Sequence, residues 1–174
     1  MKRWIEVAAS AVALALFAGV AMAAGPNDAQ IAAIVVTANQ VDIDAGELAK
    51  SKAQSPKVKE FAQLMITDHT GVNKQATALV TRLKVTPEPN DTSKALKQGG
   101  DANLANLKTL SGAAFDKAYV AHEVAYHQQV IDALDKTLVP SAQNAELKAL
   151  LVKVRPAFVA HLEHAKHLQA ELGK

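Results

Sequence analysis

Five residues in this chain combine the side-chain types and the positions that metal chemistry requires. They interrupt or border the apolar faces of predicted helices: Asp42, His69, Glu123, His127 and His161. Imidazole nitrogens and carboxylate oxygens are the ligands of divalent first-row metals such as Zn, Cu, Fe and Ni. Two negative ligands would also offset the charge of such an ion. The pattern therefore predicts that three imidazoles and two carboxylates converge on one metal ion.

The same residues permit a second interpretation, a buried hydrogen-bonded network without metal. Each histidine would then be paired with a carboxylate, because an unpaired buried polar group costs about 1–3 kcal/mol. A single core histidine is usually of this kind. Here three histidines lie on the apolar faces of three predicted helices, and carboxylates lie on faces that can reach them. The metal site and the metal-free network therefore have equal weight. Two functions stay open: a transition-metal-binding bundle, or a metal-free structural or stress-related interaction module.

The composition predicts an all-α protein, because Ala and Leu abound and no alternating β-branched run stands between turn signals. Capping and proline signals predict long helices at about 28–54, 56–84, 112–138 and 140–172. Ser55-Pro56 marks the corner between the first two, and Pro140-Ser141 starts the last. We expect residues 85–111 to form a long crossover with short helices near 93–98 and 101–110. Two antiparallel hairpins joined by one crossover define a ferritin-like four-helix bundle.

Two geometric criteria identify the acidic candidate on the first predicted helix: the face of the helix on which it lies and its distance along the helix from the corner. Asp42 sits at the edge of the inner face, whereas Glu47 points almost opposite. Asp42 precedes Ser55 by thirteen residues and His69 follows it by fourteen, so both lie about 20 Å along their helices from the corner. We therefore expect Asp42 and His69 to face each other.

Other polar residues fall off the apolar stripes. By phase, we expect His122, His164 and His167 at the rim or in solvent. Asp68 and Asp116 could hold the tautomers of the histidines, but their positions near turns or stripe edges favour ordinary solvated charges.

The first residues carry an export signal. Lys2 and Arg3 precede an apolar run over residues 7–20, and Ala21-Met22-Ala23 has the small-x-small pattern of a cleavage site. The run is shorter than the roughly 20 residues that span a bilayer. We expect a cleaved signal peptide over residues 1–23 and a single helical domain over 24–174. The mature protein would be periplasmic or secreted, with no stable membrane span.

Charge and composition exclude several partner classes. Without Lys2, Arg3 and Glu6 the chain has 17 basic and 16 acidic residues, a formal charge of +1. This balance leaves no basic footprint for nucleic acid or a membrane surface. The absence of cysteine excludes disulfides and thiolate metal sites.

Known catalytic motifs are missing from the sequence. It has no Glu-x-x-His motif, which disfavours a di-iron oxidase centre of the ferritin type. It also lacks a Gly-rich phosphate loop, a Gly-x-Ser-x-Gly elbow and a His-Glu-x-x-His motif. These absences favour binding over catalysis.

Several segments together resemble one family. They are Asp42 to Ala49, Phe61 to His69, Ser111-Gly112 with Phe115-Asp116 and Tyr119, and Pro156 before His161-Leu162. Over about residues 29–170 the chain resembles exported bacterial proteins grouped as domain of unknown function 4142, often labelled outer-membrane or ferritin-like proteins. The resemblance implies a ferritin-like bundle without a settled activity. It places the family's acidic position on Asp42 and its histidines on His69, His127 and His161. At position 123 the family commonly has glutamine.

Removal of the signal peptide predicts a change in fluorescence. Trp4 is the only tryptophan, and the mature chain would keep only Tyr119 and Tyr126 as emitters. Protein recovered from the periplasm should therefore show tyrosine emission alone. Tryptophan emission from that material, or an intact mass that begins at Met1, would show that the segment is retained.

Overall fold

The structure is a computed structural model that describes residues 25–173, and within these residues it contains helices and no strand. The expected signal peptide lies outside the described residues. The elements are α1 (Asp28–Lys52), α2 (Pro56–Arg82), α3 (Asp91–Thr109), α4 (Gly112–Ala133), the π-helical segment η1 (Leu134–Leu138), α5 (Val139–Ser141) and α6 (Ala145–Leu172). None of the helices in this range is long and apolar enough to cross a membrane. The all-α prediction is confirmed.

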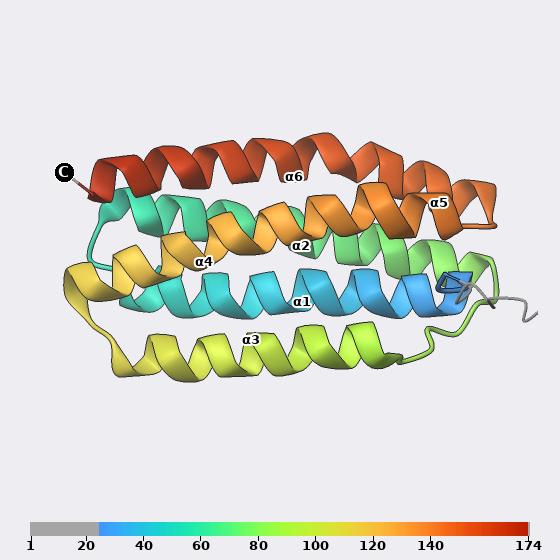
Figure 1. Cartoon of the computed structure of the whole chain (residues 1–174), viewed down its shortest axis with the longest axis horizontal. Coiled ribbons are helices and arrows are strands. Elements are labelled where there is room, and N and C mark those ends of the chain that lie inside the picture. Colours follow the sequence, from blue (N-terminus) through green and yellow to red (C-terminus); the bar gives the residue numbers. More distant parts are fainter. Residues whose placement is uncertain (1–24, 174) are drawn as a thin grey trace, which may run out of the picture.

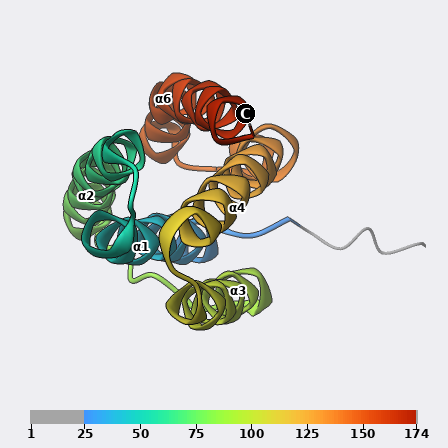
Figure 2. The same ribbon diagram turned by 90° about the vertical axis from the view of Figure 1, so that its left-hand side faces the viewer.

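Four of the helices surround a common centre. Figure 2 shows α1, α2, α4 and α6 around it, with α3 outside beside α1. In Figure 1, α1 and α2 run in opposite directions, and so do α4 and α6. Helix α2 ends at the opposite end of the molecule from the start of α4, so α3 carries the chain back along its length (Figure 1). Each of the four central helices can therefore contribute one face to a shared interior.

The segment before α4 differs from the prediction of short helices near 93–98 and 101–110, which was wrong. One helix of 19 residues, α3, runs through Gly99 and Gly100. Asn90 begins it with a capping box. At Gly100 an added Cβ would lie 2.7 Å from a methyl carbon of Val41 on α1. The glycine thus permits close packing of α3 on α1 instead of breaking the helix.

The start of the last helix was also predicted wrongly. Pro140 and Ser141 belong to α5, which continues α4 through η1, and α6 starts only at Ala145. The Asn144 side chain caps α6 by accepting hydrogen bonds from the backbone N–H groups of Glu146 and Leu147, at 2.9 and 3.1 Å. Proline is favoured in the first turn of any helix, so Pro140 fits the short α5 as well as the start of a long last helix. It does not by itself mark the start of α6.

The corner between α1 and α2 is held from a third helix. Ser55 is the N-cap residue of α2, but its side chain makes no capping hydrogen bond. The carboxylate of Asp116 on α4 instead accepts hydrogen bonds from the backbone N–H groups of Gln54, at 3.0 Å, and Ser55, at 2.7 Å. Asp116 is buried, so the expectation of a solvated charge was wrong. This contact fixes the start of α4 against the corner.

Two apolar clusters fill the interior on either side of a polar layer. One cluster includes Ile31, Val35, Val72, Ala76, Ile131, Leu134, Leu151, Val154 and Phe158. The other includes Ala45, Ala49, Phe61, Met65, Phe115, Tyr119, Val120, Ala165 and Leu168. On α1, α2 and α4 the polar candidates fall in the sequence gap between the two clusters, and on α6 His161 lies where they meet. The polar layer therefore crosses the bundle at a single level.

The corner contact predicts a loss of stability on substitution of Asp116. Asp116→Ala should lower the free energy of unfolding by about 1–3 kcal/mol, because two backbone donors lose a charged acceptor in a buried place. Urea denaturation of the two proteins measures this difference. Asp101→Ala is the matched control, because Asp101 is exposed and pairs with the exposed Lys97 on the same helix, and such pairs contribute about 0.3–0.5 kcal/mol. Equal losses in the two variants would contradict the role given to Asp116.

Candidate metal centre

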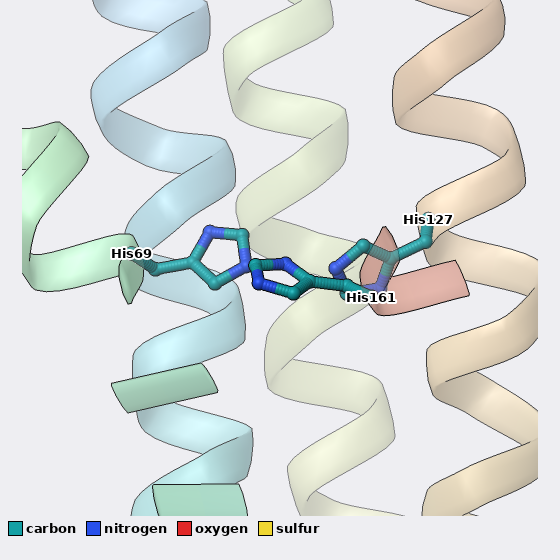
Figure 3. Close-up of side chains that lie close together, drawn as sticks. All are labelled: His69, His127 and His161. Atoms are coloured by element: carbon teal, nitrogen blue, oxygen red, sulfur yellow. The ribbon is translucent and has the colours of Figure 1, made fainter. Parts of the chain in front are cut away.

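The polar layer brings together all five residues that the sequence singled out. Asp42 comes from α1, His69 from α2, Glu123 and His127 from α4, and His161 from α6. None of the five is more than 3% exposed. Figure 3 shows the three imidazoles side by side between the helices that carry them. Three histidines from three different helices thus share one interior position.

The distances within the layer are short enough for a shared ion. One nitrogen atom of each of the three histidines lies within 4.8 Å of the others. The Nε2 atom of His69 is 3.2 Å from Oδ2 of Asp42, and that of His127 is 3.7 Å from the same oxygen. Zinc–nitrogen bonds are about 2.0–2.1 Å long, so two nitrogens on one zinc ion lie at most about 4.2 Å apart. Small side-chain movements would bring the three nitrogens into that range.

His69 is oriented by a buried asparagine. Asn39 donates its amide hydrogen to the carbonyl oxygen of Val35, at 2.8 Å, so its Oδ1 atom faces the ring and accepts from Nδ1 of His69, at 2.7 Å. The single hydrogen of the neutral imidazole therefore lies on Nδ1. The Nε2 atom, which faces Asp42, presents a lone pair.

The other two histidines are oriented in the same way by different partners. Nδ1 of His127 lies 3.0 Å from the backbone carbonyl of Glu123, which can only accept a hydrogen bond. Nε2 of His161 lies 2.9 Å from a carboxylate oxygen of Asp68. In their neutral forms the two rings therefore have their lone pairs on Nε2 of His127 and Nδ1 of His161. A hydrogen bond on the far nitrogen is the usual support of a metal-bound histidine.

The inward nitrogens of this layer have no hydrogen-bond partner. Buried and unpartnered within the described residues are Nε2 of His69, Nε2 of His127 and Nδ1 of His161, whereas the side chain of Glu123 interacts with Asp42 and Tyr119. Buried polar atoms are satisfied in the large majority of cases, so a cluster of unsatisfied ones requires an explanation. Most of these atoms are acceptors. A cation would satisfy several of them at once.

Burial and mutual proximity set the charge of the layer. Burial lowers the pKa of His69 from 6.5 to about 4, although the charge of Asp42 acts in the opposite direction. Burial also raises the pKa of Glu123 well above its ordinary value, and the neighbouring charge of Asp42 adds to this effect. For Asp42 itself burial opposes ionisation, but His69, His127 and the Glu123 side chain outweigh it and lower its pKa. Burial thus favours the neutral forms of His69 and Glu123, whereas the groups around Asp42 favour its ionised form.

Glu123 and Asp42 approach different nitrogens of His127. The Oε2 atom of Glu123 lies 3.5 Å from Nδ1 of His127, whereas Oδ2 of Asp42 lies 3.7 Å from Nε2. Glu123 also interacts with Asp42 and Tyr119. Oxygens of Asp42 and Glu123 and a nitrogen of His127 lie within 4.8 Å of one another. Glu123 therefore lies next to the three-imidazole group and can add an oxygen ligand from the Asp42 side.

Several residues of the site were missed from the sequence. Asp68 was expected to be a solvated charge, but it holds His161. Asn39 was not recognised at all, although it is a polar residue one turn before Asp42 on the inner side of α1. His122 was expected at the rim or in solvent, and it is partly buried, with its ring stacked on Tyr126 at a centroid distance of 5.5 Å. His164 and His167 are exposed, as expected.

The depressed pKa of His69 predicts that stability falls in mild acid. The unfolded chain takes up its proton near pH 6.5 and the folded chain only near pH 4, so stability is complete above 6.5 and is lost between these values. The free energy of unfolding, measured with a chelator present, should fall by about 3 kcal/mol over this range from His69. His69→Gln should flatten the dependence, while His167→Gln at an exposed position should retain it. An unchanged slope in His69→Gln would contradict a neutral buried imidazole.

Comparison with known proteins agrees with the helical architecture. A solved structure described as "CopM in the Cu(II)-bound form" is similar, with a TM-score of 0.65 and 20% sequence identity over 84% of this chain and 98% of that chain. At this identity the likeness shows a shared fold. No curated protein matches the sequence. The family described as "Domain of unknown function (DUF4142)" matches residues 9–168, which confirms the resemblance noted in the sequence. The chain therefore belongs to the DUF4142 family.

Proposed function

We propose that this protein binds one divalent transition-metal ion in the polar layer. The nitrogen ligands are Nε2 of His69, Nε2 of His127 and Nδ1 of His161, and Asp42 supplies an oxygen with Glu123 beside it. The observation that carries the proposal is that these three nitrogens are buried and unpartnered, while each of the three imidazoles brings one nitrogen within 4.8 Å of the others. Each ring is also held by a hydrogen bond on its other nitrogen. Such an arrangement prepares lone pairs for a cation.

The metal-free network fits the same contacts less well. A network would place a hydrogen between each imidazole and its neighbour. Near neutral pH, however, Nε2 of His69 and Oδ2 of Asp42 are both acceptors, and they lie 3.2 Å apart. Two lone pairs at this distance repel each other unless a proton or a metal ion lies between or beside them. The metal therefore accounts for an arrangement that the network leaves unsatisfied.

Copper(II) is the ion we propose to test first. Nitrogen-rich sites prefer copper among the divalent first-row metals by the Irving–Williams order. The structurally similar CopM is described in a Cu(II)-bound form, which supports copper over zinc, iron or nickel. We also interpret α1, α2, α4 and α6, with α3 as the crossover, as a ferritin-like bundle, and we place the binding outside the cytoplasm after loss of residues 1–23. Binding of the ion, not a reaction, is the function proposed.

Thermal stability and elemental analysis test this function. At a free copper concentration a hundredfold above Kd, binding adds about 2.7 kcal/mol, which corresponds to a rise in Tm of about 5–10 °C for a domain of this size. Protein purified without an affinity tag should also contain one copper ion per chain after loading and desalting.

Matched variants locate the effect. His127→Gln should abolish both the rise in Tm and the retained copper. His167→Gln should preserve both, because its side chain is 79% exposed and remote from the layer. If the two variants respond alike, surface histidines bind the copper and the interior is a structural network.

A further inference from the structure

A pocket of about 400 Å³ leads from the molecular surface to the polar layer. Its outer part lies between α3 and α4, where α3 contributes Thr92, Ala95, Leu96, Gly99 and Gly100. Its inner part is formed by Asp42 and His69 of the layer and by Asn39, which holds His69. Figure 2 shows α3 beside α1, outside the group formed by α1, α2, α4 and α6. The remaining layer histidines, His127 and His161, are not part of its lining.

One further histidine stands beside this pocket. His122 on α4 contributes to the lining together with Tyr126 and Gln129. Its Nε2 atom is buried and has no hydrogen-bond partner, and stacking on Tyr126 holds the ring in place. An imidazole with an unpartnered nitrogen in a largely apolar pocket is costly without a ligand. It directly precedes Glu123 in the sequence and is partly buried, whereas the residues of the layer are buried.

We propose that this pocket is the route by which the metal ion enters the centre and that His122 is a ligand on the way. The inference rests on the proposed function, since an entry route for a metal ion requires a metal site in the interior. The order of ligands follows from burial: His122 is partly buried, and Asp42 and His69, which also line the pocket, are buried. The ionised carboxylate of Asp42 draws the cation inward. His127 and His161 complete the coordination once the ion has passed Asp42.

Helix α3 packs closely on α1 and forms the outer wall of the pocket. Gly100 packs directly on Val41, so this position has no room for a larger side chain. An added Cβ at Gly99 meets no atom within 4 Å. A large side chain there would occupy the mouth of the pocket without displacing the helix backbone, and replacement of glycine within an exposed helix also favours folding.

Gly99→Phe tests the route by kinetics. Stopped-flow quenching of tyrosine fluorescence by Cu²⁺ alone measures the association rate, and capture of released copper by a chelator measures the dissociation rate. A partly blocked route should slow both rates by about tenfold or more and leave Kd within about twofold, because the bound site is unchanged. The matched control is Gly71→Phe on α2, where an added Cβ also meets no atom within 4 Å and which lies outside the pocket lining.

A second variant tests His122 separately. His122→Phe keeps an aromatic ring on Tyr126 but removes the nitrogen, so it should slow association while the stoichiometry stays at one copper ion per chain. Equal rates in Gly99→Phe, Gly71→Phe and the unaltered protein would overturn the route and point to entry elsewhere, such as past the half-exposed Asp68. If the unaltered protein binds no copper in its interior, the proposed function fails and the route fails with it.

Discussion

The carboxylate of Asp42 faces imidazole nitrogens whose rings carry their hydrogens on the opposite side. At 3.2 Å from His69 and 3.7 Å from His127, its Oδ2 atom lies among lone pairs. Burial strengthens the repulsion between the carboxylate oxygen and these lone pairs, because water is excluded and the local dielectric constant is low. Each ring is fixed by a hydrogen bond on its other nitrogen, to Asn39, the backbone carbonyl of Glu123 or Asp68. The rings therefore cannot resolve the conflict by turning, and a cation resolves it directly.

The rest of the fold maintains this layer at one level. The two apolar clusters lie on either side of it and supply the hydrophobic stabilisation that offsets the desolvation of five polar side chains. The ends of the helices are tied across the bundle by carboxylates. Asp116 of α4 holds the corner before α2, and Asp28 of α1 accepts from the backbone N–H groups of Gln143 and Asn144 just before α6, each at 2.9 Å. These contacts limit sliding of one helix along another, and such sliding would separate the histidines.

The periodicity of apolar residues correctly predicted which side chains face the interior of the bundle. The buried positions of Asp42, His69, Glu123, His127 and His161 followed from stripes that continue over many turns. The errors arose where a local signal has two structural meanings. Gly99-Gly100 can end a helix or permit close packing, and only contact with Val41 decides between them. Asn39 and Asp68 became part of the site through contacts with other helices, so no spacing within their own helices could reveal their roles.

Anomalous diffraction from a crystal of the copper-loaded protein tests the central claim most directly. The account predicts one strong copper peak in the interior, about 2.0 Å from Nε2 of His69, Nε2 of His127 and Nδ1 of His161, with an oxygen of Asp42 next to it. The choice of nitrogen atom is part of the prediction, since His161 should bind through Nδ1 and keep Nε2 on Asp68. Copper peaks confined to the exposed His164 or His167, with the interior unoccupied, would contradict the account.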